Sequence, residues 1–94
     1  MSKLEMHKEL CDRIHEIYKQ KNAAYGDSFG RSFQDWGITA CAVRCSDKWN
    51  RFCNLAKHPE IDSGDESMID TCLDMANYML MTAMELEIER KKHV

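Results

Sequence analysis

The chain has 94 residues, of which 44% are hydrophobic, and a formal net charge of -3. This length supports one modest hydrophobic core and no second domain. The charge is uneven, because residues 58–89 contain nine acidic side chains and no Lys or Arg. An acidic half lacks the basic surface that general nucleic-acid or membrane-surface binding requires. We therefore expect one domain over residues 1–94 without direct DNA or membrane binding.

Nothing in the composition indicates export. The chain begins with a charged segment, whereas a secretory signal needs an apolar run. The most apolar stretch, residues 68–84, is interrupted by three polar side chains and is a poor membrane span. Five cysteines lie mostly at apolar helical positions and form no CxxC pair, which is typical of reduced thiols in a core. These features predict a cytoplasmic protein without disulfides.

Apolar residues recur at helical spacing in three segments, so we expect an all-α fold with three main helices. The first helix covers residues 3–22, with Ser2 as its N-cap. The second runs from about residue 38 to Lys57, because Pro59 disfavours helix just before it. The residues that we expect on its buried side are Ala42, Cys45, Trp49, Phe52 and Cys53.

The third helix begins at residues 65–67 and ends at residues 90–92, where early acids and late bases both suit the helix dipole. About 27 residues at 1.5 Å each would span roughly 40 Å. A compact domain of this size has a radius of gyration of about 12 Å, so this helix should extend beyond its own fold. Ten of the fourteen residues in 75–88 are apolar and occupy two faces. This pattern predicts a homo-oligomer.

The helical pattern breaks between residues 22 and 37. The run from Tyr25 to Gly30 has the Gly and Asx chemistry of an ordered turn, and Ser28 is expected to cap a short helical turn after it. Four aromatic residues within this segment are too many for a solvated loop, and should plug one end of the bundle or wall a pocket. They are Tyr25, Phe29, Phe33 and Trp36. A second loop should connect the second and third helices over residues 58–65.

Two polar triplets share the spacing i, i+4, i+7, so each occupies one helix face. They are Arg44, Lys48 and Arg51 on the second helix, and Asp70, Asp74 and Asn77 on the third. If these helices form an antiparallel hairpin, facing residues have numbers with a constant sum. The pairs that satisfy this rule to within one residue are Arg44 with Asn77, Lys48 with Asp74, and Arg51 with Asp70. We therefore expect the two triplets to face each other.

The facing triplets have two interpretations. Opposite charges in register can form an inter-helical ladder that fixes the pairing of the helices without any chemistry. Alternatively, Asp70 and Asp74, one turn apart, can hold Mg²⁺, which takes its other ligands from water and substrate phosphates. Arg44, Lys48 and Arg51 would then hold the phosphate oxygens. The sequence shows no established catalytic fingerprint, so no catalytic residue is assigned.

Several short motifs occur in a distinctive order. They are Lys21-Asn22, Tyr25-Gly26-Asp27-Ser28-Phe29, Arg44, Ser46-Asp47-Lys48, Arg51, Glu66-Ser67, Asp70-Thr71 and Asp74-Met75-Ala76-Asn77-Tyr78. Together they resemble the nucleotide modification associated domain family, small proteins common in phages and prophages, over nearly the whole chain. The resemblance implies a nucleotide-type ligand and, for a phage protein, a bacterial host cytoplasm. It supplies no reaction.

The expected ligand site lies between the turn after the first helix and the two triplets, with Tyr25 or Phe29 stacked on the base. The expected ligand-binding residues are Lys21, Asn22, Tyr25, Ser28, Phe29, Arg44, Lys48, Arg51 and Asn77, with Asp70 and Asp74 for a metal ion.

The layout is also distantly similar to the all-α nucleotide pyrophosphatases of the MazG type, in which ExxE and ExxD motifs hold Mg²⁺ over a triphosphate. Asp74 stands where the last acid of ExxD would fall, but Thr71 replaces the Glu three residues earlier. The ExxE region reads Arg44-Cys45-Ser46-Asp47. These departures favour binding over hydrolysis.

Three functions follow from these patterns. The first is a nucleotide-binding protein of nucleotide metabolism or modification, with Mg²⁺-dependent pyrophosphate release if it is an enzyme. The second is a non-catalytic oligomeric sponge that sequesters a cyclic or modified nucleotide used as an immune signal. The third is a purely structural helical oligomer whose triplets form an ion ladder.

Overall fold

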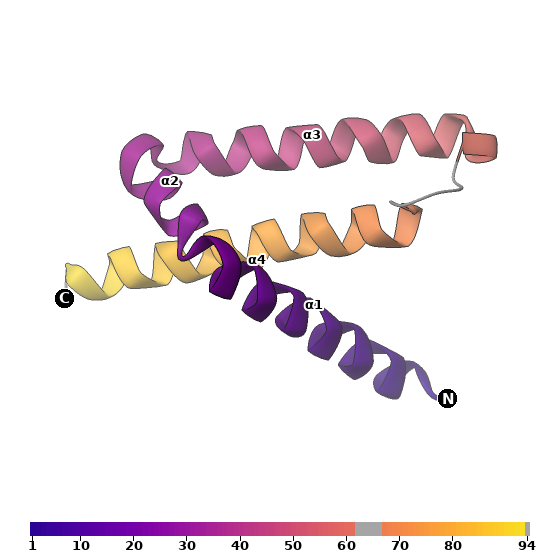
Figure 1. Ribbon diagram of the computed structural model, residues 1–94, viewed down its shortest axis with the longest axis horizontal. Helices are drawn as coiled ribbons and strands as arrows, with labels where there is room; N and C mark the ends of the chain where they lie inside the picture. Colours follow the sequence, from indigo (N-terminus) through magenta and orange to yellow (C-terminus); the bar gives the residue numbers. More distant parts are fainter. Residues whose placement is uncertain (62–66, 94) are drawn as a thin grey trace.

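The structure of the chain, a computed structural model, describes residues 1–61 and 67–93. Over these residues it contains helices and no strand, in the order α1 (Lys3–Tyr25), α2 (Ser28–Trp36), α3 (Ile38–Lys57), the short 3-10 helix η1 (Pro59–Ile61) and α4 (Met68–Lys92). Figure 1 shows α3 and α4 running antiparallel, with α1 crossing α4 obliquely. The expected all-α fold, with a long C-terminal helix antiparallel to the preceding long helix, is confirmed.

Helix α1 is longer than the sequence pattern predicted. Its start is fixed by Ser2, whose hydroxyl accepts a hydrogen bond of 3.1 Å from the Glu5 N–H. The helix continues past residue 22 to Tyr25, because the two alanines at residues 23–24 are strong helix formers. It ends at Gly26, whose φ of +67° is the left-handed conformation that glycine adopts without strain.

The expected short turn after this point is a nine-residue helix, α2. Its N-cap is Asp27 and not Ser28, because the Asp27 carboxylate accepts a hydrogen bond of 3.1 Å from the Gly30 N–H. Phe29 and Phe33, one turn apart, are buried and plug one end of the bundle as predicted. The other two aromatic side chains of this segment, Tyr25 and Trp36, are 69% and 74% exposed.

The bounds of α3 agree with the prediction, but its buried side does not. Cys41 and Leu55 are buried, whereas Trp49 is 51% exposed and stacks on Phe52 with ring centroids 5.3 Å apart. Of the other expected core residues, Ala42 is exposed, and Cys45, Phe52 and Cys53 are only partly buried. The reason is that α3 packs on α4 with the face that carries its polar triplet, which turns Trp49 away from the interior.

Helix α4 starts with a capping box. The Ser67 hydroxyl accepts from the Asp70 N–H at 3.1 Å, and the Asp70 carboxylate accepts from the Ser67 N–H at 3.1 Å. The expected start at residues 65–66 and most of the connecting loop lie outside the described residues. Buried along the helix are Leu73 and the polar residues Thr71, Asn77 and Thr82.

The molecule is elongated. Its radius of gyration is 15.1 Å and its longest dimension 47 Å, compared with about 12 Å for the radius of a compact domain of this length. The C-terminal turns of α4 extend past α2 and α3 in Figure 1, as predicted from the length of the helix. None of the 23 residues of α1 is buried, so α1 packs weakly on the rest of the chain.

The cysteines follow the prediction only in part. Cys41 is buried, and Cys45 and Cys53 are partly buried, but Cys11 and Cys72 are exposed. The exposed pair lies on outward faces of α1 and α4 that the elongated fold leaves uncovered. Among the described helices, none has an apolar stretch long enough to cross a bilayer.

Candidate functional site

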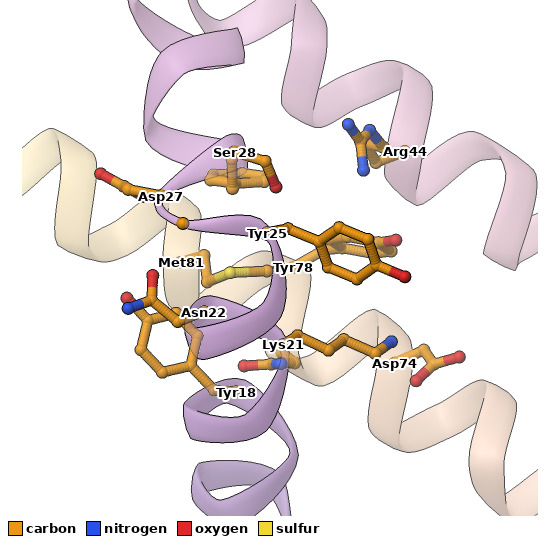
Figure 2. Close-up of a pocket in the computed structure, with 13 residues that line it drawn as sticks. Tyr18, Lys21, Asn22, Tyr25, Asp27, Ser28, Arg44, Asp74, Tyr78 and Met81 are labelled. Carbon is orange, nitrogen blue, oxygen red and sulfur yellow. The ribbon is translucent and has the colours of Figure 1, made fainter.

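A pocket of about 280 Å³ lies where α1 ends and α2 begins, and α3 and α4 complete its walls (Figure 2). This volume is close to the lower limit of about 300 Å³ for small-molecule sites in proteins. The lining residues are Tyr18, Lys21, Asn22, Tyr25, Gly26, Asp27, Ser28, Phe29, Arg44, Asp74, Asn77, Tyr78 and Met81. The site therefore draws on all four α-helices, and its size suits one small organic ligand.

Helices α1 and α4 each contribute four pocket residues with the same spacing along the chain. The α1 residues are Tyr18, Lys21, Asn22 and Tyr25, and the α4 residues are Asp74, Asn77, Tyr78 and Met81. Both sets have the spacing i, i+3, i+4, i+7, which places four side chains on one helix face. Two such faces meet at the pocket, so its shape is set by rigid helices.

Aromatic rings form the interior wall of the pocket. The rings of Phe29 and Tyr78 lie with centroids 6.2 Å apart and planes inclined by 24°. The Arg44 guanidinium lies over the Tyr78 ring, 5.9 Å from its centroid, within the range of cation–π attraction. Tyr78 is thus held between an apolar core contact and a cation.

Both cations of the pocket lie at one end, whereas the Asp27 carboxylate lies at the other. Figure 2 shows Lys21, Arg44 and Asp74 toward one side, and Tyr18, Asn22 and Met81 toward the other. Asp74 is already neutralised by Lys48, with Nζ and Oδ2 3.0 Å apart and both side chains mostly buried. Within the described part of the chain, Lys21 and the partly buried Arg44 form no ion pair. The pocket therefore has two cations available to an anionic ligand.

The two triplets do lie on facing surfaces, but two of the three expected pairs are displaced by one residue. The Lys48–Asp74 pair is confirmed. Arg51 Nε donates to Thr71 Oγ1 at 3.3 Å instead of to Asp70, and Arg44 faces Tyr78 instead of Asn77. In all three observed contacts the residue numbers have the same sum, as expected for an antiparallel pair of helices. The prediction allowed this sum to vary by one residue, and this tolerance is why two of its pairs were wrong.

Asp70 faces a different partner. One residue before Thr71, it is rotated by about 100° around α4, and its Oδ1 accepts from Arg13 Nη2 of α1 at 3.0 Å. Its Oδ2 accepts from the Ser67 N–H and hydroxyl of the capping box. The hydrogen bond from the Ser67 N–H, then that from its hydroxyl, and the charge of Arg13 hold the pKa of the Asp70 carboxyl below its usual value of 3.8.

These contacts separate the two carboxylates that the sequence offered for Mg²⁺. Asp74 lines the pocket, and Asp70 does not. In the described ranges, 1–61 and 67–93, no group of three or more His, Cys, Asp or Glu side chains is placed to hold a metal ion. A cation in the pocket would find Asp74 as its one lining carboxylate besides Asp27, which caps α2.

The prediction from sequence located most of this pocket. The expected residues that do line it are Lys21, Asn22, Tyr25, Ser28, Phe29, Arg44, Asp74 and Asn77. Lys48, Arg51 and Asp70 lie outside it, in contacts between helices. Sequence reasoning missed Tyr18, Tyr78 and Met81 as pocket residues; the signal that could have identified them is the i, i+3, i+4, i+7 spacing that they share with Lys21, Asn22, Asp74 and Asn77.

Asn77 stands out among the lining residues. It is 8% exposed, and its Oδ1 has no hydrogen-bond partner among the described residues. The two other buried polar residues of α4 are satisfied, because the Thr71 hydroxyl donates to the Ser67 carbonyl and the Thr82 hydroxyl donates to the Tyr78 carbonyl. The unsatisfied acceptor is thus confined to the residue that lines the pocket.

Comparison of the chain with protein-family models, with curated proteins and with solved structures gives no match.

Proposed function

We propose that the pocket binds a phosphorylated nucleoside. The observation that carries this proposal is the presence, in one small pocket, of aromatic rings beside two cations that have no carboxylate partner among the described residues. A nucleotide has the complementary parts, a flat base and an anionic phosphate. The resemblance to the nucleotide modification associated domain family, and its phage setting, agree with this ligand class.

The aromatic rings of the pocket are suited to stacking on the base. Tyr25 is 69% exposed at the edge of the pocket, whereas Tyr78 is held in its wall by Phe29 and Arg44. Stacking of a base on an aromatic side chain contributes about 1–3 kcal/mol. An exposed Tyr25 beside a fixed Tyr78 is suited to closing on a base from one side while the wall receives it on the other.

The cations provide for the phosphate. Arg44 is partly buried, so its hydrogen bonds with a phosphate are less screened by water than those of a surface residue. Lys21 is exposed and adds a flexible point charge. Together they would hold a phosphate at the end of the pocket where Figure 2 also shows the rings of Tyr25 and Tyr78, which would receive the base.

Binding without hydrolysis is the form of this function that the site favours. A Mg²⁺-dependent pyrophosphatase needs several carboxylates around the metal, and here Asp74 is paired with Lys48 while Asp70 is bonded to Ser67 and Arg13. This arrangement supports the sponge, which captures a cyclic or modified nucleotide and keeps it intact, over a MazG-like enzyme. Magnesium would act, if bound, through Asp74 and the phosphates of the ligand.

We also propose that the protein is a homo-oligomer. Apolar side chains on the first turns of α1 are exposed, with Leu4 at 85%, Met6 at 49% and Leu10 at 38%. Helix α4 exposes six more, Ile69, Met79, Leu80, Met84, Leu86 and Ile88. A 23-residue helix without a buried residue gains little from its own chain, and a second copy would cover it. Light scattering should give a mass above 11.0 kDa, and Leu4→Lys with Leu10→Lys should reduce it to the monomer.

The ligand proposal is tested by calorimetric titration of the purified protein with a panel of nucleoside mono-, di- and triphosphates and cyclic dinucleotides, with Mg²⁺ and with a chelator. Lys21→Ala should weaken binding about tenfold, the loss of one charged contact. Lys19→Ala, the same change two residues away and outside the pocket, should leave binding unchanged. Recovery of the intact ligand after denaturation would support the sponge, and recovery of a cleaved product would support an enzyme. If no nucleotide of the panel binds, the proposal is wrong.

A further inference from the structure

A buried acceptor without a partner is costly, and the cost needs an explanation. A polar group that is desolvated and left unsatisfied opposes folding, because the hydrogen bond it made with water in the unfolded chain is not replaced. Asn77 carries such a group at Oδ1, and it is one of the residues that line the pocket. An apolar side chain of the same size at this position would remove the cost. The asparagine is therefore unfavourable for folding alone.

We propose that Asn77 is the specificity-determining residue of the pocket and that it reads an adenine-type base. This inference rests on the proposed nucleotide ligand and adds the identity of its base. A carboxamide presents an acceptor and a donor side by side. Adenine presents the complementary pair, with an exocyclic amino group that donates and a ring nitrogen that accepts, and asparagine commonly binds adenine in this bidentate way.

The position of Asn77 agrees with this role. It lies one turn along α4 from Asp74 and one turn before Met81, two residues that Figure 2 shows toward opposite sides of the pocket. A phosphate held by Arg44 and Lys21 would thus leave the base beside the side chain of Asn77. Its neighbour Tyr78 supplies an aromatic wall next to the same position, so stacking and edge recognition would act on one base.

Burial makes the recognition selective. When the base lacks the amino group, the Asn77 Oδ1 stays without a hydrogen bond in the complex. The cost of keeping this oxygen away from water is then not offset, so the binding free energy is less favourable. A bidentate contact of this kind discriminates by about 1–3 kcal/mol, which corresponds to at least about a fivefold difference in affinity. The pocket should therefore reject bases that lack the donor rather than merely bind them through fewer contacts.

The test compares adenosine 5′-monophosphate with purine riboside 5′-monophosphate, which differs only in lacking the 6-amino group. The wild-type protein should bind the first about tenfold more tightly. Asn77→Leu should abolish this difference by weakening binding of the amino nucleotide, and should leave the unfolding temperature unchanged or raise it. The control is Thr82→Val, on the same helix, which should lower the unfolding temperature and keep the discrimination.

The outcomes distinguish the two proposals. Equal binding of both nucleotides by the wild type, or unchanged discrimination in Asn77→Leu, would overturn the role of Asn77 and leave the nucleotide pocket standing. A clear loss of stability in Asn77→Leu would show that Oδ1 is satisfied in solution and that the residue is structural, which also overturns the inference. If the wild type binds neither of these two nucleotides and no other nucleotide of the panel, both proposals are wrong.

Discussion

Gly30 and Asp27, which also lines the pocket, are expected to be energetically coupled. A Cβ atom added at Gly30 would collide with the Asp27 carboxylate, which caps α2 through the Gly30 N–H. Gly30→Ala therefore displaces the cap. Losing an N-cap costs about 1 kcal/mol, while replacing glycine by alanine inside a helix gains roughly 0.5–1 kcal/mol. The net change in the free energy of unfolding should be close to zero.

The two contributions separate in a double-mutant cycle measured by urea unfolding. In an Asp27→Ala background the cap is already lost and the obstruction is gone, so Gly30→Ala should now stabilise the protein by about 0.5–1 kcal/mol, or roughly 2–8 °C in unfolding temperature. The coupling energy should be about 1 kcal/mol. If Gly30→Ala has the same effect in both backgrounds, the Asp27 carboxylate does not occupy the space beside Gly30 and the account of the α2 cap is wrong.

Two further predictions concern charge. Lys48→Met leaves Asp74 partly buried without its partner, so it should lower the free energy of unfolding by about 1–2 kcal/mol, between the values for exposed and buried pairs. Adding Asp74→Leu should recover most of this loss. No recovery would show that the ion pair is unimportant for stability. The pKa of Asp70 is lowered in the folded state, so its contribution to stability is present above its unfolded pKa of 3.8 and is lost as the pH falls through the folded value. Asp70→Asn should therefore reduce stability at pH 7, and in urea titrations this loss should shrink as the pH falls below 3.8. An equal loss at every pH would contradict this assignment.

The long helices could be predicted because their signals are local. The bounds of α3 and the C-terminal end of α4 follow from helical periodicity, Pro59 and the terminal bases, and each acts within a few residues. The end of α1 was predicted too early, because Asn22 resembles a helix terminator while the true stop is Gly26. The cap of α2 was assigned to Ser28 for a similar reason, since Asp and Ser are both good N-caps and stand next to each other.

The site was harder to predict because it depends on rotation between helices. A shift of one residue along a helix turns the side chain by about 100° around the helix axis. This rotation alone separates Asp70, which contacts Arg13 of α1, from Thr71, which contacts Arg51 of α3. Trp49, which sequence placed in the core, is exposed for a different reason: α3 packs on α4 with its polar face, and Trp49 lies about 100° away from Lys48 around the helix. Charges alone left the register undetermined within one residue, because Lys48 with Asp74 fits one alignment and Arg51 with Asp70 fits the alignment one residue away.

The helical origin of the pocket has a consequence for how this chain can change over generations. Most binding sites are built on loops, which tolerate insertions and deletions. Here eight of the pocket side chains come from two helix faces at fixed intervals of three and four residues. One residue inserted between Tyr18 and Tyr25 would swing half of the α1 set out of the site. Ligand preference in this lineage should therefore drift by single substitutions at these positions, while the lengths of the two segments stay constant.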